Sequence, residues 1–198
     1  MITFGKYEQD NNLDNGKEDI EWLVLAKEED RILVISKYAL DCQRYNTANK
    51  GVTLETCTLR GWLNDTFLSK AFTDEESSMI PTVTVGADKN PIFQHIDPGN
   101  VTQDQIFLLS ITETEQYFST DEARKCVPTI YAIAQGAETN DSYKIDGKAT
   151  CWWWLRSPGI LADAAAGISN DGSVFSFGNR VDRGVNAVRP ALWINLAS

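Results

Sequence analysis

The sequence has few of the residues that bind transition metals or act as catalytic bases. It contains one histidine, His95, and four cysteines, at positions 42, 57, 126 and 151, without a Cys-x-x-Cys pair. A zinc site needs several such ligands at one place, so we expect no bound metal. The sequence also lacks a phosphate-binding loop, a dinucleotide-binding fingerprint, a nucleophile elbow and a His-Glu-x-x-His motif. We therefore expect no cofactor and no assembled catalytic set.

Long apolar segments are also missing. No stretch approaches the roughly 20 apolar residues that cross a bilayer, so we expect no membrane insertion. The N-terminal residues 1–7 lack the charged-then-apolar pattern of a secretory signal. This favours a cytoplasmic protein, or a surface or secreted protein whose leader precedes this sequence. In the second case Cys42 and Cys57 could form a disulfide, although buried free thiols are the favoured interpretation.

Positive charge is scarce, and its distribution is uneven. The chain carries a net charge of −10, yet residues 151–198 contain four arginines and three aspartates, which sum to +1. The other 150 residues therefore carry −11. An acidic surface repels phosphates, which argues against nucleic acid and anionic membranes as partners. The neutral C-terminal quarter is where we expect a neutral or weakly anionic ligand to approach.

One acidic segment partly matches the spacing of a calcium-binding loop. Asp10, Asn12 and Asp14 occupy the first, third and fifth positions, and Glu21 occupies the twelfth. The sixth position is Asn15 instead of glycine, and the flanking segments have the pattern of strands. We favour a polar loop between two strands, with calcium as the alternative.

Hydrophobic periodicity predicts a mixture of strands and short helices. Residues 20–25 and 32–35 are predicted strands that flank a polar turn. Apolar residues recur at helical spacing over 59–71, which predicts a helix that docks through Trp62. Three short helices are predicted from the capping boxes that begin at Thr73, Thr112 and Ser119.

The C-terminal quarter has the pattern of β-structure. Asp146-Gly147 and Asp171-Gly172 predict two hairpin turns, and residues 188–196 predict a closing strand in which Pro190 marks an edge or a bulge. No composition break or internal repeat divides the chain. We predict a single α+β domain over residues 1–198, with a mixed or antiparallel sheet, short helices and a β-rich C-terminal quarter.

The segment Cys151-Trp-Trp-Trp-Leu-Arg-Ser-Pro-Gly159 is the most distinctive in the chain. Consecutive tryptophans place indoles on both faces of a strand, which must be covered on both sides or left as an apolar patch. In one interpretation Arg156 and Arg189 bind backbone carbonyls and stack on indoles to hold the sheet. In the other, four residues line a ligand groove beside the small-residue loop 160–166. These candidate site residues are Trp152, Trp154, Arg156 and Asp163.

Seven segments of the chain together resemble DUF6273, a bacterial domain family of unknown function. The matching segments are Phe4–Tyr7, Ile20–Leu25, Leu33–Leu40, Leu59–Asn64, Phe107–Ser110, Trp153–Gly159 and Val188–Trp193. The family has no established activity, so the resemblance implies no catalytic residue. A tryptophan-rich strand, a Gly/Asp hairpin and a closing arginine-containing strand are also similar to the end of C-type-lectin-like domains, an architecture shared by formylglycine-generating enzymes. This implies a C-type-lectin-like fold. The sugar-specifying calcium motif and the paired C-terminal cysteines are missing, so neither activity is implied.

These observations favour a non-enzymatic module that binds a glycan or a peptide. Abundant aromatic and arginine side chains without a catalytic set are the reason for this prediction. One alternative is a diverged, cofactor-independent enzyme whose site lies around Cys151, Arg156 and Asp163. Another is a purely structural module within larger surface proteins.

Overall fold

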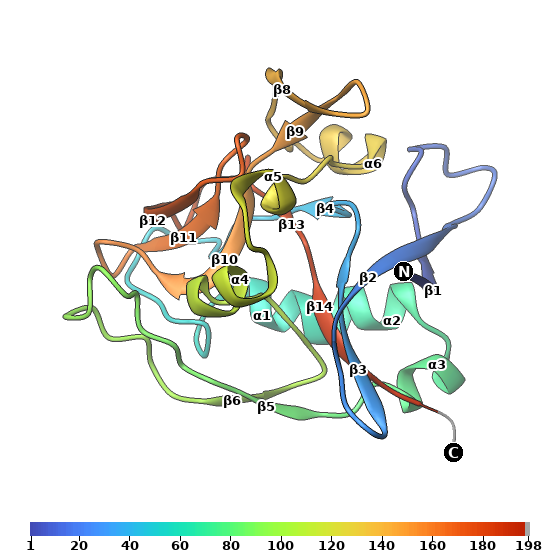
Figure 1. Ribbon diagram of the computed structural model, residues 1–198, viewed down its shortest axis with the longest axis horizontal. Helices are drawn as coiled ribbons and strands as arrows, with labels where there is room; N and C mark the ends of the chain where they lie inside the picture. Colours follow the sequence, from blue (N-terminus) through green and yellow to red (C-terminus); the bar gives the residue numbers. More distant parts are fainter. Residues whose placement is uncertain (197–198) are drawn as a thin grey trace.

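Two five-stranded sheets form the framework of the computed structural model, which describes residues 1–196 (Figure 1). The first sheet has the order β1-β2-β3-β14-β7, and the second has the order β12-β11-β10-β13-β4. The strands of the first sheet are β1 (Ile2–Tyr7), β2 (Glu18–Lys27), β3 (Arg31–Ser36), β14 (Ala191–Asn195) and β7 (Ile106–Phe107). Those of the second are β12 (Val174–Arg180), β11 (Ala164–Ile168), β10 (Trp153–Pro158), β13 (Ala187–Val188) and β4 (Asp41–Cys42). Among the strand pairs of the described chain, only β10 and β13 run parallel.

The closing segment of the chain joins the two sheets. Ala187 in β13 pairs with Trp153, whereas Ala191 in β14 pairs with Ile35. Arg189 and Pro190 lie between these strands, so the single strand predicted over 188–196 is wrong. Proline has no N–H to donate to a ladder, and the chain changes sheets at this point. The carbonyl of Pro190 still accepts a hydrogen bond from Ser36 N, at 3.0 Å.

The predicted hairpins are confirmed. Strands β2 and β3 include the predicted segments 20–25 and 32–35 and pair in antiparallel register. Asp171-Gly172 joins β11 to β12, and Asp146-Gly147 joins β8 (Thr139–Ile145) to β9 (Lys148–Cys151). Asp146 and Gly147 have φ angles of 50° and 77°, the left-handed values that a two-residue hairpin turn requires. A further ribbon pairs β5 (Val83–Val85) with β6 (Thr102–Asp104).

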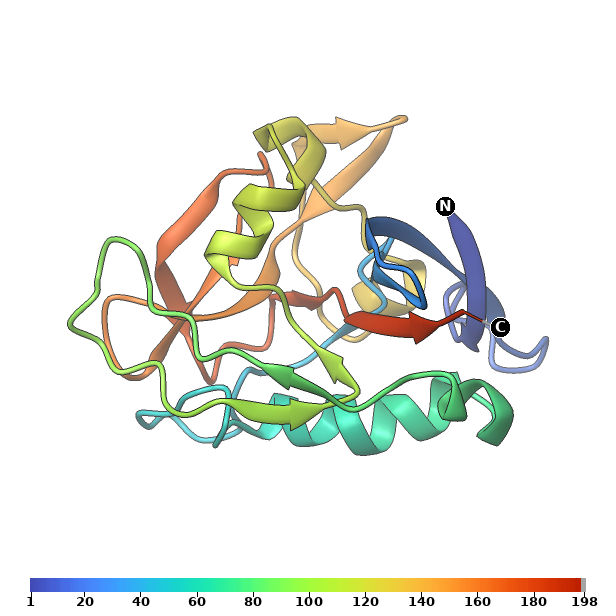
Figure 2. The same ribbon diagram turned by 60° about the horizontal axis from the view of Figure 1, so that its bottom comes forward.

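One continuous helical rod runs along one side of the molecule (Figure 2). It consists of α1 (Thr58–Trp62), a π-helical turn η1 (Leu63–Phe67) and α2 (Leu68–Ala71). Its buried stripe is Leu59, Leu63, Phe67 and Ala71. These residues recur every four positions, so they lie on one face of the rod. Trp62 is only partly buried and packs against Phe67 at the edge of the core, so the helix docks mainly through the other four residues and only in part through Trp62.

Four short helices complete the fold, and their caps test the predicted starts. They are α3 (Asp74–Ser78), α4 (Ile111–Tyr117), α5 (Asp121–Arg124) and α6 (Ile130–Ala134). The capping box of Thr73 and Glu76 is confirmed. The box predicted at Thr112 is wrong, because Ser110 and Glu113 cap α4. The helix predicted from Ser119 begins one residue later, with Thr120 as its N-cap. The apolar segments of the described chain include no helix long enough to span a membrane.

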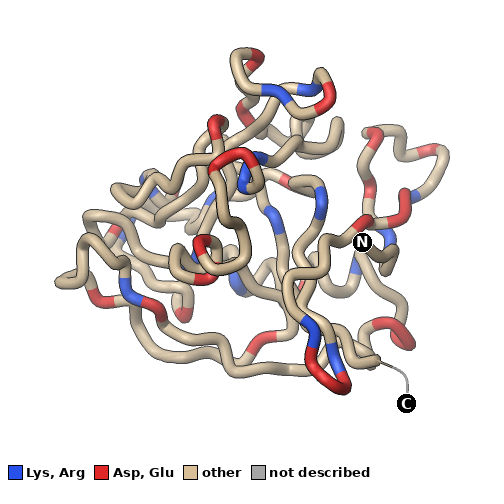
Figure 3. The backbone as a smooth tube through the Cα atoms, in the orientation of Figure 1, with Lys and Arg blue, Asp and Glu red and all other residues tan. Residues whose placement is uncertain are grey.

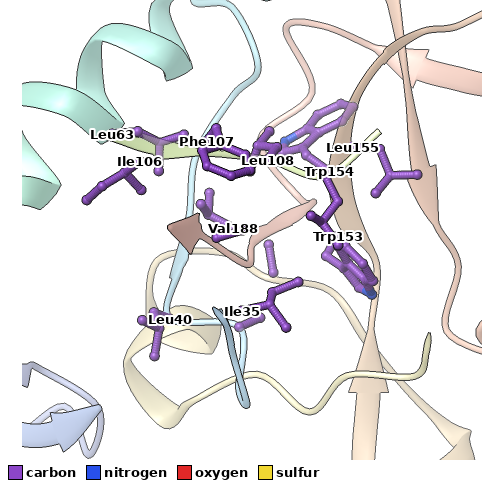
Figure 4. Packing of buried hydrophobic residues seen from close by; sticks show 14 of the residues in the cluster. Ile35, Leu40, Leu63, Ile106, Phe107, Leu108, Trp153, Trp154, Leu155 and Val188 are labelled. Atoms are coloured by element: carbon purple, nitrogen blue, oxygen red, sulfur yellow. The ribbon is translucent and has the colours of Figure 1, made fainter. Parts of the chain in front are cut away.

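The buried hydrophobic residues form one cluster, to which both sheets and the helical rod contribute. Figure 4 shows part of it, with Ile35 from the first sheet, Trp153 and Val188 from the second, and Leu63 from the rod. The chain is therefore an α+β fold around a single core, as predicted. All four cysteines are buried and free, as favoured, so Cys42 and Cys57 do not form a disulfide.

Candidate functional site

The tryptophan segment occupies the middle of the second sheet. Strand β10 lies between β11 and β13, and Trp153 and Trp154 are fully buried on its two faces. The indole N–H of Trp153 donates to Arg124 O at 3.1 Å, and that of Trp154 donates to Gln43 O at 2.9 Å. Both indoles are therefore core residues with satisfied donors. Trp154 is not available to line a groove.

Arg156, the second predicted site residue on this strand, is equally enclosed. Its Nε donates to Gly86 O at 3.0 Å, and its Nη1 donates to Leu108 O at 2.9 Å. The guanidinium also forms ion pairs with Glu113 and Asp88. Glu113 belongs to the capping box of α4, so Arg156 joins this helix to the segment that follows β5. This supports the first interpretation, in which the arginine holds the fold.

The residues of the predicted enzymatic alternative are not joined. Cys151 is fully buried, and burial raises the pKa of its thiol well above the ordinary value. Asp163 is partly exposed in the loop between β10 and β11, where its carbonyl accepts a hydrogen bond from Val181 N. Among residues 1–196, no hydrogen bond connects Cys151, Arg156 and Asp163. Their arrangement offers no activated nucleophile.

The small residues of the following loop serve close packing. A Cβ at Gly159 would lie 2.4 Å from Phe177 O and 2.8 Å from Ala164 Cβ. The three alanines 164–166 are buried within β11. The backbone at Gly159 therefore packs directly against β11 and β12, and a larger side chain would not fit there.

The first tryptophan of the segment contributes instead to a row of aromatic rings that ends at the surface. Trp152 lies edge-on to Phe175 with ring centres 5.2 Å apart, and Phe175 lies 6.2 Å from Phe177. The ring of Phe93, from the loop between β5 and β6, lies 5.1 Å from that of Phe177. Phe177 is 53% exposed, and the other three are partly buried. We call these four residues the aromatic row.

Two sets of contacts fix the position of Phe93 in this row. Arg156 binds the carbonyl of Gly86 and the carboxylate of Asp88, at the start of the loop. Asn90 is fully buried, and its Nδ2 donates to Pro158 O and Ser176 O, each at 2.8 Å. Its Oδ1 accepts a hydrogen bond from Phe93 N at 3.2 Å. The loop between β5 and β6 is thus anchored to β10 and β12, with Phe93 held against Phe177.

Of the four predicted site residues, the structure brings only Trp152 to this row. Phe175, Phe177 and Phe93 were missed. The alternation Phe175-Ser-Phe177 after a hairpin turn was the available signal for the first two, because alternate residues share one face of a strand. The sequence gives no comparable signal for Phe93, whose position depends on hydrogen bonds to distant strands. A role for Asp163 in binding stays a prediction.

The acidic segment near the N-terminus forms a different arrangement from the calcium loop considered above. Glu21 pairs with Lys37 at 2.9 Å and does not join Asp10. The carboxylates of Glu8, Asp10 and Glu18 lie within 4.8 Å of one another. Glu18 accepts hydrogen bonds from the backbone N–H groups of residues 9 and 10, and Glu8 accepts one from that of residue 12. These carboxylates hold the loop between β1 and β2, in agreement with the favoured polar loop.

Comparison with known proteins assigns the chain to a family. The sequence profile of a domain of unknown function, DUF6273, matches residues 29–196. The chain belongs to the DUF6273 family. The match includes both the aromatic row and β10, whereas β1 and β2 precede it. No curated protein and no solved structure matches the chain, so the predicted C-type-lectin-like fold is not confirmed.

Proposed function

We propose that this DUF6273 domain is a binding module that holds a neutral glycan against the aromatic row. The observation that carries the proposal is the continuity of four rings, spaced 5.1–6.2 Å apart, that lead from the sheet to an exposed phenylalanine. Exposed contiguous apolar surface is characteristic of interaction sites. Sugar rings present flat C–H faces, which pack on aromatic faces, while their hydroxyl groups need polar neighbours.

The polar neighbours of the row are amides and charged side chains at its margin. Asn179 lies partly exposed on β12, and its Nδ2 donates to Asn186 Oδ1 at 3.3 Å. The Nδ2 of Asn186 is buried and has no hydrogen-bond partner among residues 1–196. Arg180, at the end of the same strand, is exposed and pairs with Asp182. Asn179 and Arg180 are therefore the accessible donors for sugar hydroxyls on this strand, whereas the Nδ2 of Asn186 is enclosed.

The loop between β5 and β6 covers part of the edge of β12, which favours a glycan over an extended peptide as the ligand. An added peptide strand would need free backbone groups along an edge strand, and β12 is an edge of its sheet. Asn90 already donates to Ser176 O, and the loop that contains Asn90 lies against this strand. Strand addition would displace that loop, whereas stacking on the rings leaves it in place.

A glycan array and a matching peptide array, each in calcium and in EDTA, test the proposal. We expect glycan binding that does not depend on calcium. Phe177→Ala should weaken it by roughly 3- to 10-fold, the equivalent of one aromatic contact. Ile130→Ala removes an exposed apolar side chain that lies outside the row and should leave binding unchanged.

Three results would overturn the proposal. The first is an absence of glycan binding, and the second is equal binding by the wild type and Phe177→Ala. The third is binding of peptides alone, which would make the row a protein-interaction surface. Circular dichroism of Phe177→Ala checks that the fold is retained, so that a loss of binding is attributable to the ring.

A further inference from the structure

A cavity that shares no lining residue with the aromatic row is lined by basic side chains. It has a volume of about 240 Å³ and lies between the β8–β9 hairpin, α5 and the end of β3. Its basic lining residues are Lys37, Lys125, Lys148 and Arg189. Its acidic lining residues are Glu122 and Asp146. In Figure 3 much of the acidic charge lies on peripheral loops and hairpins, such as the turn between β2 and β3. The cavity therefore carries two more basic than acidic side chains, in a chain of net charge −10.

Arg189 is the buried cation of this cavity. Only 1% of the residue is exposed, and its guanidinium lies 5.0 Å from the ring of Trp153 and 5.3 Å from that of Phe118. Its Nε donates to Ser36 O at 2.9 Å. Its Nη1 has no hydrogen-bond partner among residues 1–196, and no acidic residue there forms an ion pair with it. A buried charge without a counter-ion is costly, and an anion in the cavity would relieve that cost.

The three lysines differ in whether they are already paired. Lys37 pairs with Glu21, and Lys125 pairs with Glu122. Lys148 forms no salt bridge with the described residues. Its Nζ lies 5.9 Å from the ring of Tyr38, which also lines the cavity. Lys148 is exposed, so it can donate to a ligand without first breaking an ion pair.

We propose that this cavity binds a small oxyanion, a carboxylate or a phosphate, between Arg189 and Lys148. Both groups are N–H donors that form their strongest hydrogen bonds with anionic oxygen. The volume is below the range of about 300–1,000 Å³ that drug-sized ligands occupy, so the cavity suits an anion of a few atoms. Leu23, Val127 and Ile145 also line it, and they would accommodate a short apolar group attached to a carboxylate.

Isothermal titration calorimetry of the whole domain tests the proposal with two probes, inorganic phosphate and propionate. Ionic strength is held constant with chloride, because salt screens surface charges. We expect saturable binding of one equivalent of at least one probe. Binding of phosphate alone identifies a phosphate site, and binding of propionate alone identifies a carboxylate site.

Variants of two lysines on the same hairpin locate the binding. Lys148→Gln should weaken it roughly tenfold, as expected for the loss of one charge-assisted hydrogen bond. Lys144→Gln is the matched control, because Lys144 lies on β8, pairs with Asp141 and does not line the cavity. Both positions are exposed, so both variants should fold. The proposal is overturned if neither probe gives saturable heat, or if Lys148→Gln and Lys144→Gln bind equally well.

Discussion

Replacing Arg156 with methionine tests whether its guanidinium stabilises the fold or is available to bind a ligand. Methionine has a similar length but no N–H group and no charge. The substitution leaves the carbonyls of Gly86 and Leu108 without their donors and leaves Glu113 and Asp88 without their cation. If Arg156 only lined a ligand groove, its replacement would leave the stability of the fold unchanged. These contacts predict a loss of stability instead.

The expected loss of stability follows from the burial of each partner. The buried carbonyl of Leu108, left without this donor, costs about 1–3 kcal/mol, and that of Gly86 costs less because it is only partly buried. The Arg156 side chain is 2% exposed, but the carboxylates of Glu113 and Asp88 are 28% and 38% exposed. Water can hydrate both carboxylates after the substitution, so their share is below the 3–5 kcal/mol typical of a broken buried ion pair. We expect a total destabilisation of about 3 kcal/mol.

Urea denaturation of the wild type and Arg156→Met measures this difference. Arg180→Met is the control, because Arg180 is exposed and its ion pair with Asp182 should be worth at most about 0.5 kcal/mol. We also expect faster amide hydrogen exchange at Phe93, since Arg156 binds the loop that holds it. A destabilisation below about 1 kcal/mol would refute the assigned role, and Arg156 would again be a candidate for ligand contact.

Three further predictions concern the core, a turn and a buried acid. Trp62→Ala should cost about 1–2 kcal/mol in denaturant melts, below the 3–5 kcal/mol of a fully buried aromatic, since the indole is only partly buried; a loss above about 3 kcal/mol would contradict this. Gly172→Ala should cost about 2–4 kcal/mol, because its Cβ would lie 1.8 Å from Asp121 O. Gly147 also has a positive φ but no atom within 4 Å of its Cβ position, so Gly147→Ala should cost about 1 kcal/mol. Equal losses of stability in the two variants would show that the contact with Asp121 is unimportant. Burial raises the pKa of Asp41 above 3.8, although hydrogen bonds oppose this, so its contribution to stability is complete below that pH and is lost as the pH rises through the folded-state pKa. Asp41→Asn should remove this loss in urea melts at increasing pH, and parallel pH profiles for the wild type and the variant would contradict the assignment.

Local signals in the sequence were sufficient where the geometry itself is local. Asp-Gly pairs favour turns between strands, so both hairpins were predictable without tertiary information, although only Asp146-Gly147 forms a two-residue turn. The N-cap of α4 was less predictable, because Ser110-x-x-Glu113 and Thr112-x-x-Glu115 both fit the capping-box pattern. Tertiary contacts favour the first, since Ser157 Oγ accepts a hydrogen bond from Ile111 N and Arg156 binds Glu113.

The candidate site was harder to predict because burial depends on distant strands. Trp154 and Arg156 belong to a segment that was equally compatible with a core or a groove. The partners that enclose Arg156, Gly86 and Glu113, lie 70 and 43 residues away in sequence. Hydrophobic periodicity gives the face of a strand on which a residue lies, but not what covers that face. Phe93 joined the aromatic row through Asn90, a contact that composition cannot show.

The three consecutive tryptophans now have three different roles, each set by strand alternation. Trp152 and Trp154 point to one face of the second sheet, and Trp153 points to the other. Trp154 packs against Tyr45 in the core, with ring centres 5.5 Å apart. Trp152 begins the aromatic row, while Trp153 lies beneath the guanidinium of Arg189, which lines the proposed oxyanion cavity. The two proposed sites therefore lie on opposite faces of the second sheet near the start of β10. Phe177→Ala and Lys148→Gln each address one site, which is why those two variants separate the proposals.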